Sequence, residues 1–372
     1  MKYYIIAGEA SGDLHGSNLM RSIRKLDQEA SFRAWGGDHM KSEGAEIVKH
    51  INELAFMGFV EVLKNLPVIM NNLKFCKKDI LHFRPDVVIF IDYPGFNLRI
   101  AEFVKSQKIK SLYYISPQLW AWNRSRVKAI KRDVDKMLVI LPFEKDFYAD
   151  YNYDVEFVGH PLLDAISRFE SETDEKLFRQ KNHLSEKQIV ALLPGSRKQE
   201  IAKMLKTMAE IPSRFPSYQF VVAATNAHTP RFYQQFIKDK NVKIVFNQTH
   251  QLLQVSYGAL VTSGTATLET ALAGVPQIVC YKAGNISYHI AKHLIKVKYI
   301  SLVNLIMDRQ IVIELIQHDF NVNRIASELK KILENRETRQ NIIENYTKLR
   351  NKLGGEGASE NAAKAVIRFV NS

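Results

Sequence analysis

The feature of this sequence that most constrains its fold is an alternation between short, continuous apolar runs and segments with helical spacing. Apolar residues at helical spacing, such as Leu19, Ile23 and Leu26, lie between several of the runs. Strands that are apolar along their whole length are buried on both faces, so the pattern predicts a parallel sheet covered by helices. In the first half the expected strands are Tyr3–Ala7, Phe32–Gly36, Val87–Asp92, Ser111–Ser116, Met137–Leu141 and Val155–Val158.

The same rhythm restarts after a polar stretch, Ser167–Glu186. A chain of 372 residues is long for one domain, so we expect an α/β protein with two doubly wound, Rossmann-like domains. We assign residues 1–168 and 187–353 to these domains, and 354–372 to a C-terminal helix that crosses back to the first domain or is exchanged in a dimer. The strands expected in the second half are Ile189–Leu193, Phe220–Ala224, Lys243–Phe246, Ala259–Thr262 and Gln277–Tyr281.

The charge balance favours an anionic partner. Lys and Arg number 52 against 39 Asp and Glu, a net charge of +13, which suits nucleic acid, an anionic membrane surface or phosphorylated substrates. A basic solvated surface is the alternative.

Cys76 and Cys280 stand apart in apolar stretches and are expected to be buried free thiols in a reducing cytoplasm. No signal peptide is apparent, and no apolar run reaches the roughly 18–20 residues of a membrane span, so we expect a protein that touches a membrane without crossing it.

Two segments of the second half have the pattern of phosphate sites. Ala191–Arg197 reads ALLPGSR, a strand that opens into a helix; Gly195, Ser196 and Arg197 would offer backbone amides and a guanidinium. An exposed arginine at a helix start is the alternative. Thr262–Glu269 reads TSGTATLE and repeats this design.

In the second of these segments, Gly264 would admit a ligand to the backbone, and Ser263 or Thr265 could cap the helix. The amides of Thr265, Ala266 and Thr267 would then face a pyrophosphate. Glu269, about one turn into the helix, could grip ribose hydroxyls or only complement the helix dipole. Two anion sites with a carboxylate beside one of them favour a nucleotide diphosphate.

In the first half, Asp92 ends the apolar run DVVIFID. A buried carboxylate there is costly unless it has a partner or a function. Asp92 is therefore a general base or ligand clamp, or else it forms an Asx turn or caps a helix that begins near Asn97. The N-terminal turn GEASGD is not a dinucleotide fingerprint and lacks the phosphate-loop lysine. Ligands of doubly wound sheets bind outside the carboxyl ends of the strands, and polar clusters at nearly every strand end predict a cleft between two facing domains.

The stretch from Phe56 to Phe75 combines an apolar helix pattern with basic flanks, as an interfacial membrane contact would; ordinary core packing is the alternative. The expected contact residues are Met57, Phe59, Val60, Val62, Leu63 and Leu66. A basic run, Arg124–Lys136, lies beside Trp120 and Trp122, which suits a bilayer interface or single-stranded nucleic acid.

His289 and His293 have helical i, i+4 spacing but no third metal ligand beside them, so we expect a surface pair rather than a metal site. No Asp-x-Asp motif is present near the expected cleft, and we predict an enzyme without a metal or other cofactor.

Taken in order, GEASGD, WGGDHM, ELAFMGFVEVL, PDVVIFIDYPGFN, YYISPQLWAW, LPFE, FVGHPLLD, LLPGSRKQEI, SGTATLE and YISLVNL resemble the lipid-A-disaccharide synthase family over nearly the whole chain. The resemblance implies a GT-B glycosyltransferase whose C-terminal domain (residues 187–353) holds the UDP-sugar and whose N-terminal domain (residues 1–168) holds the acceptor and contacts the membrane. The implied reaction joins UDP-2,3-diacylglucosamine to 2,3-diacylglucosamine 1-phosphate (lipid X) and gives a β-1',6-linked disaccharide 1-phosphate and UDP.

Family members attach peripherally to the cytoplasmic face of the inner membrane in Gram-negative bacteria. Some form dimers that exchange C-terminal segments, so a homodimer is one expected state, and nucleic acid is not an expected partner. The alternatives are another GT-B enzyme on a UDP-amino-sugar, such as a transferase or 2-epimerase, and a nucleic-acid-binding protein, which would leave GSR and SGTATLE unexplained.

The resemblance also assigns roles to individual residues. Asp92 falls at an essential aspartate and is the candidate general base, while Arg197 and Asn304 fall at an arginine and an asparagine that the family needs. Glu269 is expected to face the ribose. The N-terminal turn belongs to the acceptor side, where Gly8 and Gly12 would let the sugar approach the backbone and Glu9, Ser11 and Asp13 would bind its hydroxyls. Relatives vary at Gln118, Asn123 and Lys282–Tyr288, so the uracil and acyl contacts stay open.

Overall fold

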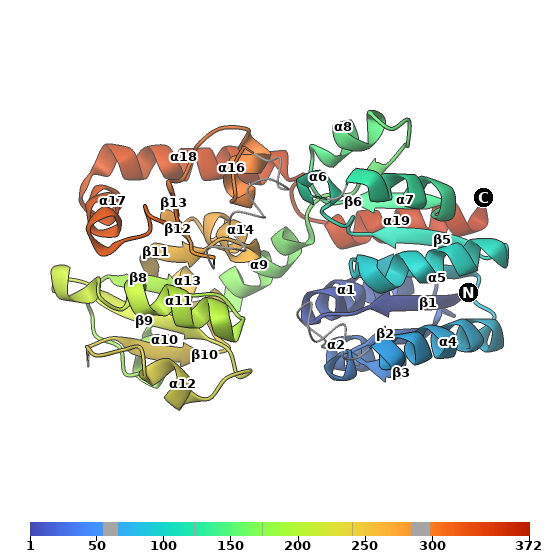
Figure 1. The fold of residues 1–372 in the computed structure, drawn as a ribbon, viewed down its shortest axis with the longest axis horizontal. Coiled ribbons are helices and arrows are strands. Elements are labelled where there is room, and N and C mark those ends of the chain that lie inside the picture. The colour runs from blue at the N-terminus through green and yellow to red at the C-terminus, as the bar shows by residue number, and fades with distance from the viewer. Residues whose placement is uncertain (55–65, 123, 173, 240, 284–297) are drawn as a thin grey trace. The chain divides into compact units, whose positions relative to one another are not determined.

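The computed structural model describes residues 1–54, 66–122, 124–172, 174–239, 241–283 and 298–372. The chain forms two compact units (Figure 1). The first unit consists of Met1–Pro161 and Leu353–Ser372, and the second of Leu162–Lys352. Helices α9 (Pro161–Glu172) and α10 (Glu175–Lys181) occupy the polar stretch in which the sequence places the domain boundary.

The first unit is built on a parallel sheet with strand order β3-β2-β1-β4-β5-β6-β7. Its central strands are buried at every position except the first residues of β1 and β5, as expected for the inside of a parallel sheet. The strands are β1 (Lys2–Ala7), β2 (Ser31–Gly36), β3 (Glu46–His50), β4 (Val87–Ile91), β5 (Lys110–Tyr114), β6 (Lys136–Val139) and β7 (Glu156–Phe157).

One face of this sheet forms the main core of the unit. Tyr4, Phe90 and Tyr113 from three strands pack with apolar side chains of α4, α5 and α7. Each fully buried large side chain of this kind contributes roughly 1.5–3 kcal/mol. The helical segments of the unit are α1 (Ala10–Leu26), α2 (Asp38–Ser42), η1 (Ile51–Glu53), α4 (Leu66–Phe83), α5 (Pro94–Ser106), α6 (Leu119–Trp122), η2 (Arg124–Arg126), α7 (Val127–Asp133), α8 (Glu144–Ala149) and α19 (Ala358–Asn371).

The C-terminal helix returns to the first unit. Figure 1 shows α19, in red, among elements drawn in blue and cyan, and it packs against α1. Lys110 Nζ donates to the carbonyl oxygens of Phe369 and Val370 at 3.2 and 2.8 Å. A cation at the last carbonyls of a helix satisfies groups that have no partner within the helix. This contact therefore anchors the end of α19 to β5.

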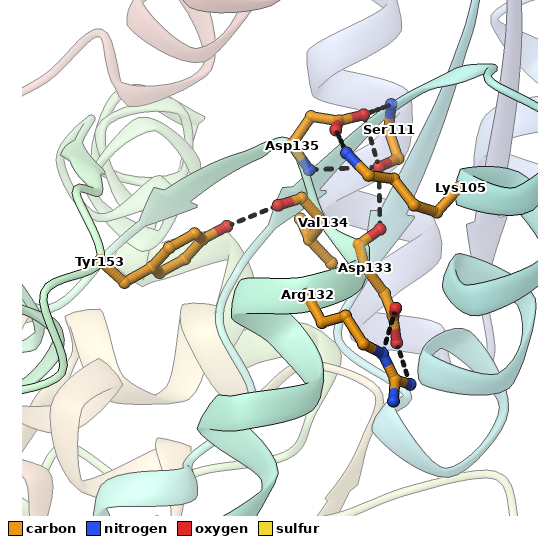
Figure 2. Close-up of polar contacts among 7 residues, drawn as sticks. All are labelled: Lys105, Ser111, Arg132, Asp133, Val134, Asp135 and Tyr153. Atoms are coloured by element: carbon orange, nitrogen blue, oxygen red, sulfur yellow. Dashed lines mark hydrogen bonds and ion pairs between the residues drawn. The ribbon is translucent and has the colours of Figure 1, made fainter.

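The amino-terminal ends of β5 and β6 are held by a structural polar network (Figure 2). The Asp135 carboxylate accepts from the Ser111 backbone N–H at 2.9 Å and from the Ser111 hydroxyl at 3.1 Å. Lys105 forms an ion pair with the same carboxylate. The Tyr153 hydroxyl donates to the Val134 carbonyl at 3.0 Å. These groups lie at the opposite end of the strands from Asp92.

The second unit contains a parallel sheet with strand order β10-β9-β8-β11-β12-β13. Its strands are β8 (Ile189–Leu193), β9 (Gln219–Ala224), β10 (Lys243–Phe246), β11 (Ser256–Thr262), β12 (Gln277–Tyr281) and β13 (Glu314–Ile316). Besides α9 and α10, its helical segments are α11 (Lys198–Met208), η3 (Pro212–Arg214), α12 (Pro230–Gln234), α13 (Thr249–Gln254), α14 (Thr265–Leu272), α16 (Leu302–Met307), α17 (Val322–Glu334) and α18 (Arg336–Lys352).

The structure confirms the predicted fold class, and every expected strand is present within a few residues of its predicted ends. Two strands were missed, β3 and β13, and both lie at sheet edges. The residues of β3 are partly exposed and β13 has only three residues. Neither forms the continuous apolar run by which the other strands were predicted. Cys76 and Cys280 are buried free thiols, as expected.

Candidate active site

The carboxyl ends of β1 and β4 bring two acidic residues of the first unit together. The strands are neighbours, with Ala7 paired to Ile91 at their ends. Glu9 follows β1 as the N-cap residue of α1, and Asp92 follows β4 directly. The pairing therefore places both carboxylates at the edge of the sheet where ligands of doubly wound folds bind.

Asp92 lies in an environment that suits a general base. Its side chain is half-buried, and the pKa of its carboxyl is raised to about 6, chiefly by burial and then by the negative charge of Glu9. A hydrogen bond from the Tyr93 backbone N–H opposes the shift. A carboxylate with such a pKa is ionised at neutral pH yet holds a proton more strongly than an exposed one.

The alternative role for Asp92, a helix cap, is excluded. Helix α5 begins at Pro94, and its N-cap residue is Tyr93, without a side-chain capping bond. Asp92 and Tyr93 instead both have left-handed backbones, with φ of 44° and 50°. Non-glycine residues seldom adopt this conformation, and where they do it often marks a functional position.

Three residues of the N-terminal turn, Gly8, Gly12 and Asp13, have packing or hydrogen-bonding roles within the protein. A Cβ on Gly8 would lie 2.3 Å from Tyr93 Cγ, so the tyrosine ring, rather than a sugar, fills this space. Gly12 is buried, and its Cβ would meet that of Ala7 at 3.0 Å; glycine here permits close packing of α1 on β1. Glu9 and Ser11 are exposed, as binding to a ligand requires.

Asp13 is also a structural residue. Its buried carboxylate accepts hydrogen bonds from the backbone N–H groups of Gly37 at 2.7 Å, His39 at 3.0 Å and Met40 at 3.0 Å. These are free donors at the start of α2, so Asp13 joins α1 to that helix. Both of its oxygens therefore accept backbone N–H groups, which gives Asp13 a structural role, and the acceptor role expected for it stays a prediction.

Glu144, in the LPFE motif, is a buried acid that sequence reasoning left without a role. Its carboxylate accepts from Trp120 Nε1 at 3.3 Å and from the Leu141 backbone N–H at 3.0 Å. Burial raises the pKa of Glu144 to about 7, which these hydrogen bonds oppose. The contact from Trp120 joins α6, which follows β5, to the first residue of α8, which follows β6. It could have been suspected from the adjacent motifs SPQLWAW and LPFE, each of which follows a strand.

In the second unit, the GSR segment forms the turn between β8 and α11. Gly195 has φ of 98°, in the region that favours glycine, and Arg197 is the exposed N-cap residue of α11. Arg197 and Glu200 both act on the hydroxyl of Tyr281 at the end of β12: burial raises the pKa of Tyr281, Glu200 raises it further and Arg197 lowers it. The GSR turn therefore lies at the carboxyl ends of the strands, where the sequence placed an anion site.

The SGT segment forms a comparable turn between β11 and α14. Gly264 has φ of 156° and ψ of −164°, a backbone that is essentially restricted to glycine, and no atom lies within 4 Å of a Cβ built on it. Neither predicted cap is present: Gly264 is the N-cap residue, and the Ser263 hydroxyl donates to the Ile300 carbonyl at 2.8 Å. Thr265 is exposed and Ala266 half-buried at the start of the helix.

Two details refine this second anion site. The Thr267 backbone N–H donates to the Gly264 carbonyl at 3.1 Å and is not directed at a ligand, contrary to the prediction. The half-buried Glu269 carboxyl has its pKa raised by burial. No other described residue forms a hydrogen bond or ion pair with the Glu269 carboxylate, which leaves it available to a ligand.

The structure does not support a catalytic role for Asn304. The side chain is fully buried and makes four hydrogen bonds: Nδ2 donates to the Val312 carbonyl at 2.9 Å and to Glu314 Oε1 at 2.8 Å, and Oδ1 accepts from Ile311 N–H at 2.7 Å and Val312 N–H at 3.0 Å. Every hydrogen-bonding position of the amide is filled. Asn304 therefore joins α16 to the strand that contains Glu314.

Several predicted residues lie outside the described part of the chain or are incompletely described. Met57, Phe59, Val60, Val62 and Leu63, and the pair His289 and His293, are not described, and Leu66 is described only as the first residue of α4. Across the ranges that the structure does describe, no helix is long and apolar enough to span a membrane.

The fold and the two strand-edge sites define the class of protein. Two parallel sheets, each covered by helices, with glycine-rich turns after the strands, form the GT-B type of α/β fold. The structure of UDP-GlcNAc 2-epimerase from Neisseria meningitidis bound to UDP-GlcNAc superposes with a TM-score of 0.67 at 12% identity and covers 100% of both chains. The calicheamicin glycosyltransferase CalG4 superposes with a TM-score of 0.60 at 14% identity and covers 99% of this chain and 98% of its own.

Sequence comparison then defines the family. Residues 3–369 match the profile of the family described as lipid-A-disaccharide synthetase, and the chain belongs to that family. Lipid-A-disaccharide synthase from Syntrophus aciditrophicus is 39% identical over 98% of this chain and 97% of its own length. The enzyme of the same name from Coxiella burnetii is 37% identical over 99% of this chain and 98% of its own length. The resemblance found in the sequence is confirmed: this is a glycosyltransferase of lipid A biosynthesis that forms the disaccharide.

Proposed function

We propose that the enzyme transfers 2,3-diacylglucosamine from its UDP derivative to lipid X with inversion at the anomeric carbon. The products are the β-1',6-linked disaccharide 1-phosphate and UDP. The observation that carries this proposal is Asp92, an acid at the carboxyl end of a central strand whose pKa is raised to about 6. An inverting transfer needs one base at the acceptor and a stabilised leaving phosphate at the donor.

In the proposed mechanism, the Asp92 carboxylate takes the proton from the 6-hydroxyl of lipid X. The oxygen of that hydroxyl attacks the anomeric carbon of the donor from the face opposite UDP. The bond between this carbon and the phosphate oxygen breaks, and its electron pair leaves with UDP. The exposed Glu9, beside Asp92, is proposed to bind an acceptor hydroxyl. Burial, and after it the charge of Glu9, raises the pKa of Asp92 and so favours proton abstraction.

The donor is proposed to lie against the second unit. Gly195, Ser196 and Arg197 would hold one phosphate, and the guanidinium would neutralise the charge that develops on UDP. Gly264 leaves open space at its Cα, so the other phosphate can approach the amides of Thr265 and Ala266. Glu269 would accept hydrogen bonds from the ribose hydroxyls. On this proposal Arg197→Ala lowers kcat/KM for the donor about 10²-fold or more and leaves the KM for lipid X unchanged.

We also propose that the enzyme attaches peripherally to the cytoplasmic face of the inner membrane. Helix α4 supports this proposal because it exposes large apolar side chains, Val68 at 42% and Met70 at 48%. The exposed Lys74 and Lys78 lie on the same helix. Apolar side chains beside cations favour an anionic bilayer surface. A surface of this kind would also bring the enzyme to its two acylated substrates.

Vesicle binding tests the membrane proposal. Full-length Val68→Ser/Met70→Ser protein should bind vesicles that contain anionic lipid at least several-fold more weakly than wild type. Leu177→Ser is the matched control, because Leu177 is 61% exposed on α10 of the second unit. Equal binding by the double variant and the control would remove α4 from the membrane contact.

Substrate discrimination tests the activity. Purified enzyme should form disaccharide, identified by mass, from UDP-2,3-diacylglucosamine and lipid X, and should release UDP from non-acylated UDP-GlcNAc far more slowly. Release of UDP from both sugars at equal efficiency would favour a different enzyme acting on UDP-amino-sugars. Conversion of UDP-GlcNAc to its 2-epimer would identify that enzyme as an epimerase.

A further inference from the structure

The carbonyl oxygen of Asp92 is held by two side chains that belong to different elements. Asn97 Nδ2, on α5, donates to it at 2.7 Å. The Tyr113 hydroxyl, at the carboxyl-terminal end of β5, donates to the same oxygen. Both donors are fully buried. A backbone carbonyl that follows a strand and turns inward to two buried donors cannot rotate without leaving both of them unsatisfied.

These contacts hold a backbone that would otherwise relax. Asp92 and Tyr93 are consecutive residues with left-handed φ angles of 44° and 50°. Aspartate adopts this backbone as a single residue, but two such angles in succession without a glycine are unusual, and tyrosine seldom adopts one. The Tyr93 ring lies over Gly8 and stacks on Phe96 with centroids 5.5 Å apart. The ring thus holds the second residue of the pair, while the two donors hold the first.

The orientation of the Asn97 amide supports its role as a hydrogen-bond donor to the Asp92 carbonyl. Its Nδ2 is also 3.4 Å from the carbonyl oxygens of Ile6 and Ile91, at the ends of β1 and β4. The flipped orientation would direct the amide oxygen at these carbonyls, so the donor must face them. Within the described chain, Oδ1 of Asn97 is buried without a hydrogen-bond partner. A buried acceptor without a partner is destabilising and calls for an explanation, which the three carbonyl contacts of Nδ2 provide.

We propose that Asn97 and Tyr113 are positioning residues of the transferase: through the Asp92 carbonyl they fix the backbone that directs the Asp92 carboxylate toward the acceptor hydroxyl. This inference rests on the proposed role of Asp92 as the base. Burial raises the pKa of Tyr113 well above its ordinary value, so the hydroxyl keeps its proton and stays a donor across the working pH range. Without the two donors the peptide would return toward an extended conformation and displace the carboxylate.

Tyr113→Phe tests the proposal because it removes one hydroxyl and keeps the ring in the core. We expect kcat to fall about 10–100-fold, since a displacement of about 1 Å in a catalytic group has an effect of this size. The KM for the UDP-sugar should stay within about twofold of wild type. The acid limb of the kcat/KM profile should move to lower pH as the displaced carboxyl becomes more exposed.

The charged or titratable groups near this carboxyl come from several elements, and all are retained in the variant except the tyrosine itself. They are Glu9 before α1, Tyr93 before α5, Tyr113 on β5 and, facing Tyr113, Tyr148 of α8 and Arg126 of η2. A shift of the acid limb in the variant therefore reports on the Asp92 carboxyl and not on the loss of a neighbouring charge.

Tyr153→Phe is the matched control. Its hydroxyl also donates to a backbone carbonyl, that of Val134 at 3.0 Å, but at the other end of the sheet (Figure 2). The control should keep kcat and the acid limb of the wild type. An unchanged kcat in Tyr113→Phe, an equal loss in both variants, or a lower kcat with an unmoved acid limb would each overturn the positioning role.

Asp92→Ala separates this inference from the proposed function. If Asp92→Ala is inactive while Tyr113→Phe behaves as wild type, the positioning role alone is wrong. If Asp92→Ala retains full turnover, Asp92 is not the base and the proposed function fails together with the inference that depends on it.

Discussion

Replacing Asp92 by Asn should abolish transfer and, at neutral pH, make the protein more stable. Asparagine keeps the side-chain oxygen that accepts the Tyr93 N–H, and it tolerates the left-handed backbone well. What it removes is a negative charge that the fold disfavours. The pKa of Asp92 is raised from 3.8 to about 6, and each unit corresponds to about 1.4 kcal/mol. The ionised carboxyl therefore costs the folded state at most about 3 kcal/mol, and we expect a gain of about 1–3 kcal/mol in the variant.

The stability gained in Asp92→Asn should depend on pH, and it should be larger at high pH than at low pH. Because the folded-state pKa lies above the unfolded-state value, the folded protein binds the extra proton, and stability is lost as the pH rises from about 4 to 6. The gain from Asp92→Asn should thus be full at pH 7.5 and fall to roughly 0.5 kcal/mol at pH 4. Urea unfolding of the full chain, followed at both pH values for wild type and variant, measures this difference.

Asp135→Asn is the matched control. Asp135 forms an ion pair with Lys105 and accepts from Ser111 (Figure 2), so the same chemical change should destabilise the protein there. The account of Asp92 would be refuted if Asp92→Asn were less stable than wild type at pH 7.5. It would be refuted equally by a gain of the same size at pH 4.

Three further predictions, one of them with a matched control, concern Glu9, Gly8 and Asn304. Glu9→Gln should move the acid limb of the kcat/KM profile to lower pH, because the Glu9 charge is the second cause of the raised pKa at the base; an unmoved limb would contradict the coupling. Gly8→Ala should lower kcat at least about tenfold, since its Cβ would lie 2.3 Å from a tyrosine ring. Gly95→Ala, in open space on the adjoining helix, should keep wild-type activity. Asn304→Ala should reduce the free energy of unfolding by about 2–4 kcal/mol, and unchanged stability with lost activity would restore its catalytic role.

The fold could be predicted from the sequence because each inner strand is marked by a short run of consecutive apolar residues. A strand such as Ile189–Leu193 is apolar at every position, and the structure gives it those bounds. The strand Glu46–His50 gave no such signal, since an edge strand is covered on fewer sides and its residues stay partly exposed. The continuous apolar run thus identifies every inner strand of the two parallel sheets, whereas of the four edge strands it identifies two, Lys243–Phe246 and Glu156–Phe157, and misses the other two.

The roles of single polar residues were harder to predict, because motif position does not reveal what a side chain contacts. Asp13 and Asp92 both lie in polar turns after strands. Asp13 is buried against the backbone N–H groups of another helix, while the Asp92 carboxyl stays half-exposed with a raised pKa. That difference depends on residues distant in sequence, Gly37 for one and Glu9 for the other. The left-handed backbone at Asp92 likewise depends on Tyr113, whose position in the sequence gives no hint of it.

Disaccharide formation by wild type and Asp92→Ala, measured side by side, tests the role of Asp92 as the base of the transfer. Each full-length protein is incubated with UDP-2,3-diacylglucosamine and lipid X, and the disaccharide 1-phosphate is quantified by mass. We expect steady product formation by wild type and a loss of at least about 10³-fold in Asp92→Ala, because the variant lacks the general base. Undiminished product formation by the variant would contradict the assignment of Asp92, and absence of the disaccharide with wild type would contradict the proposed reaction.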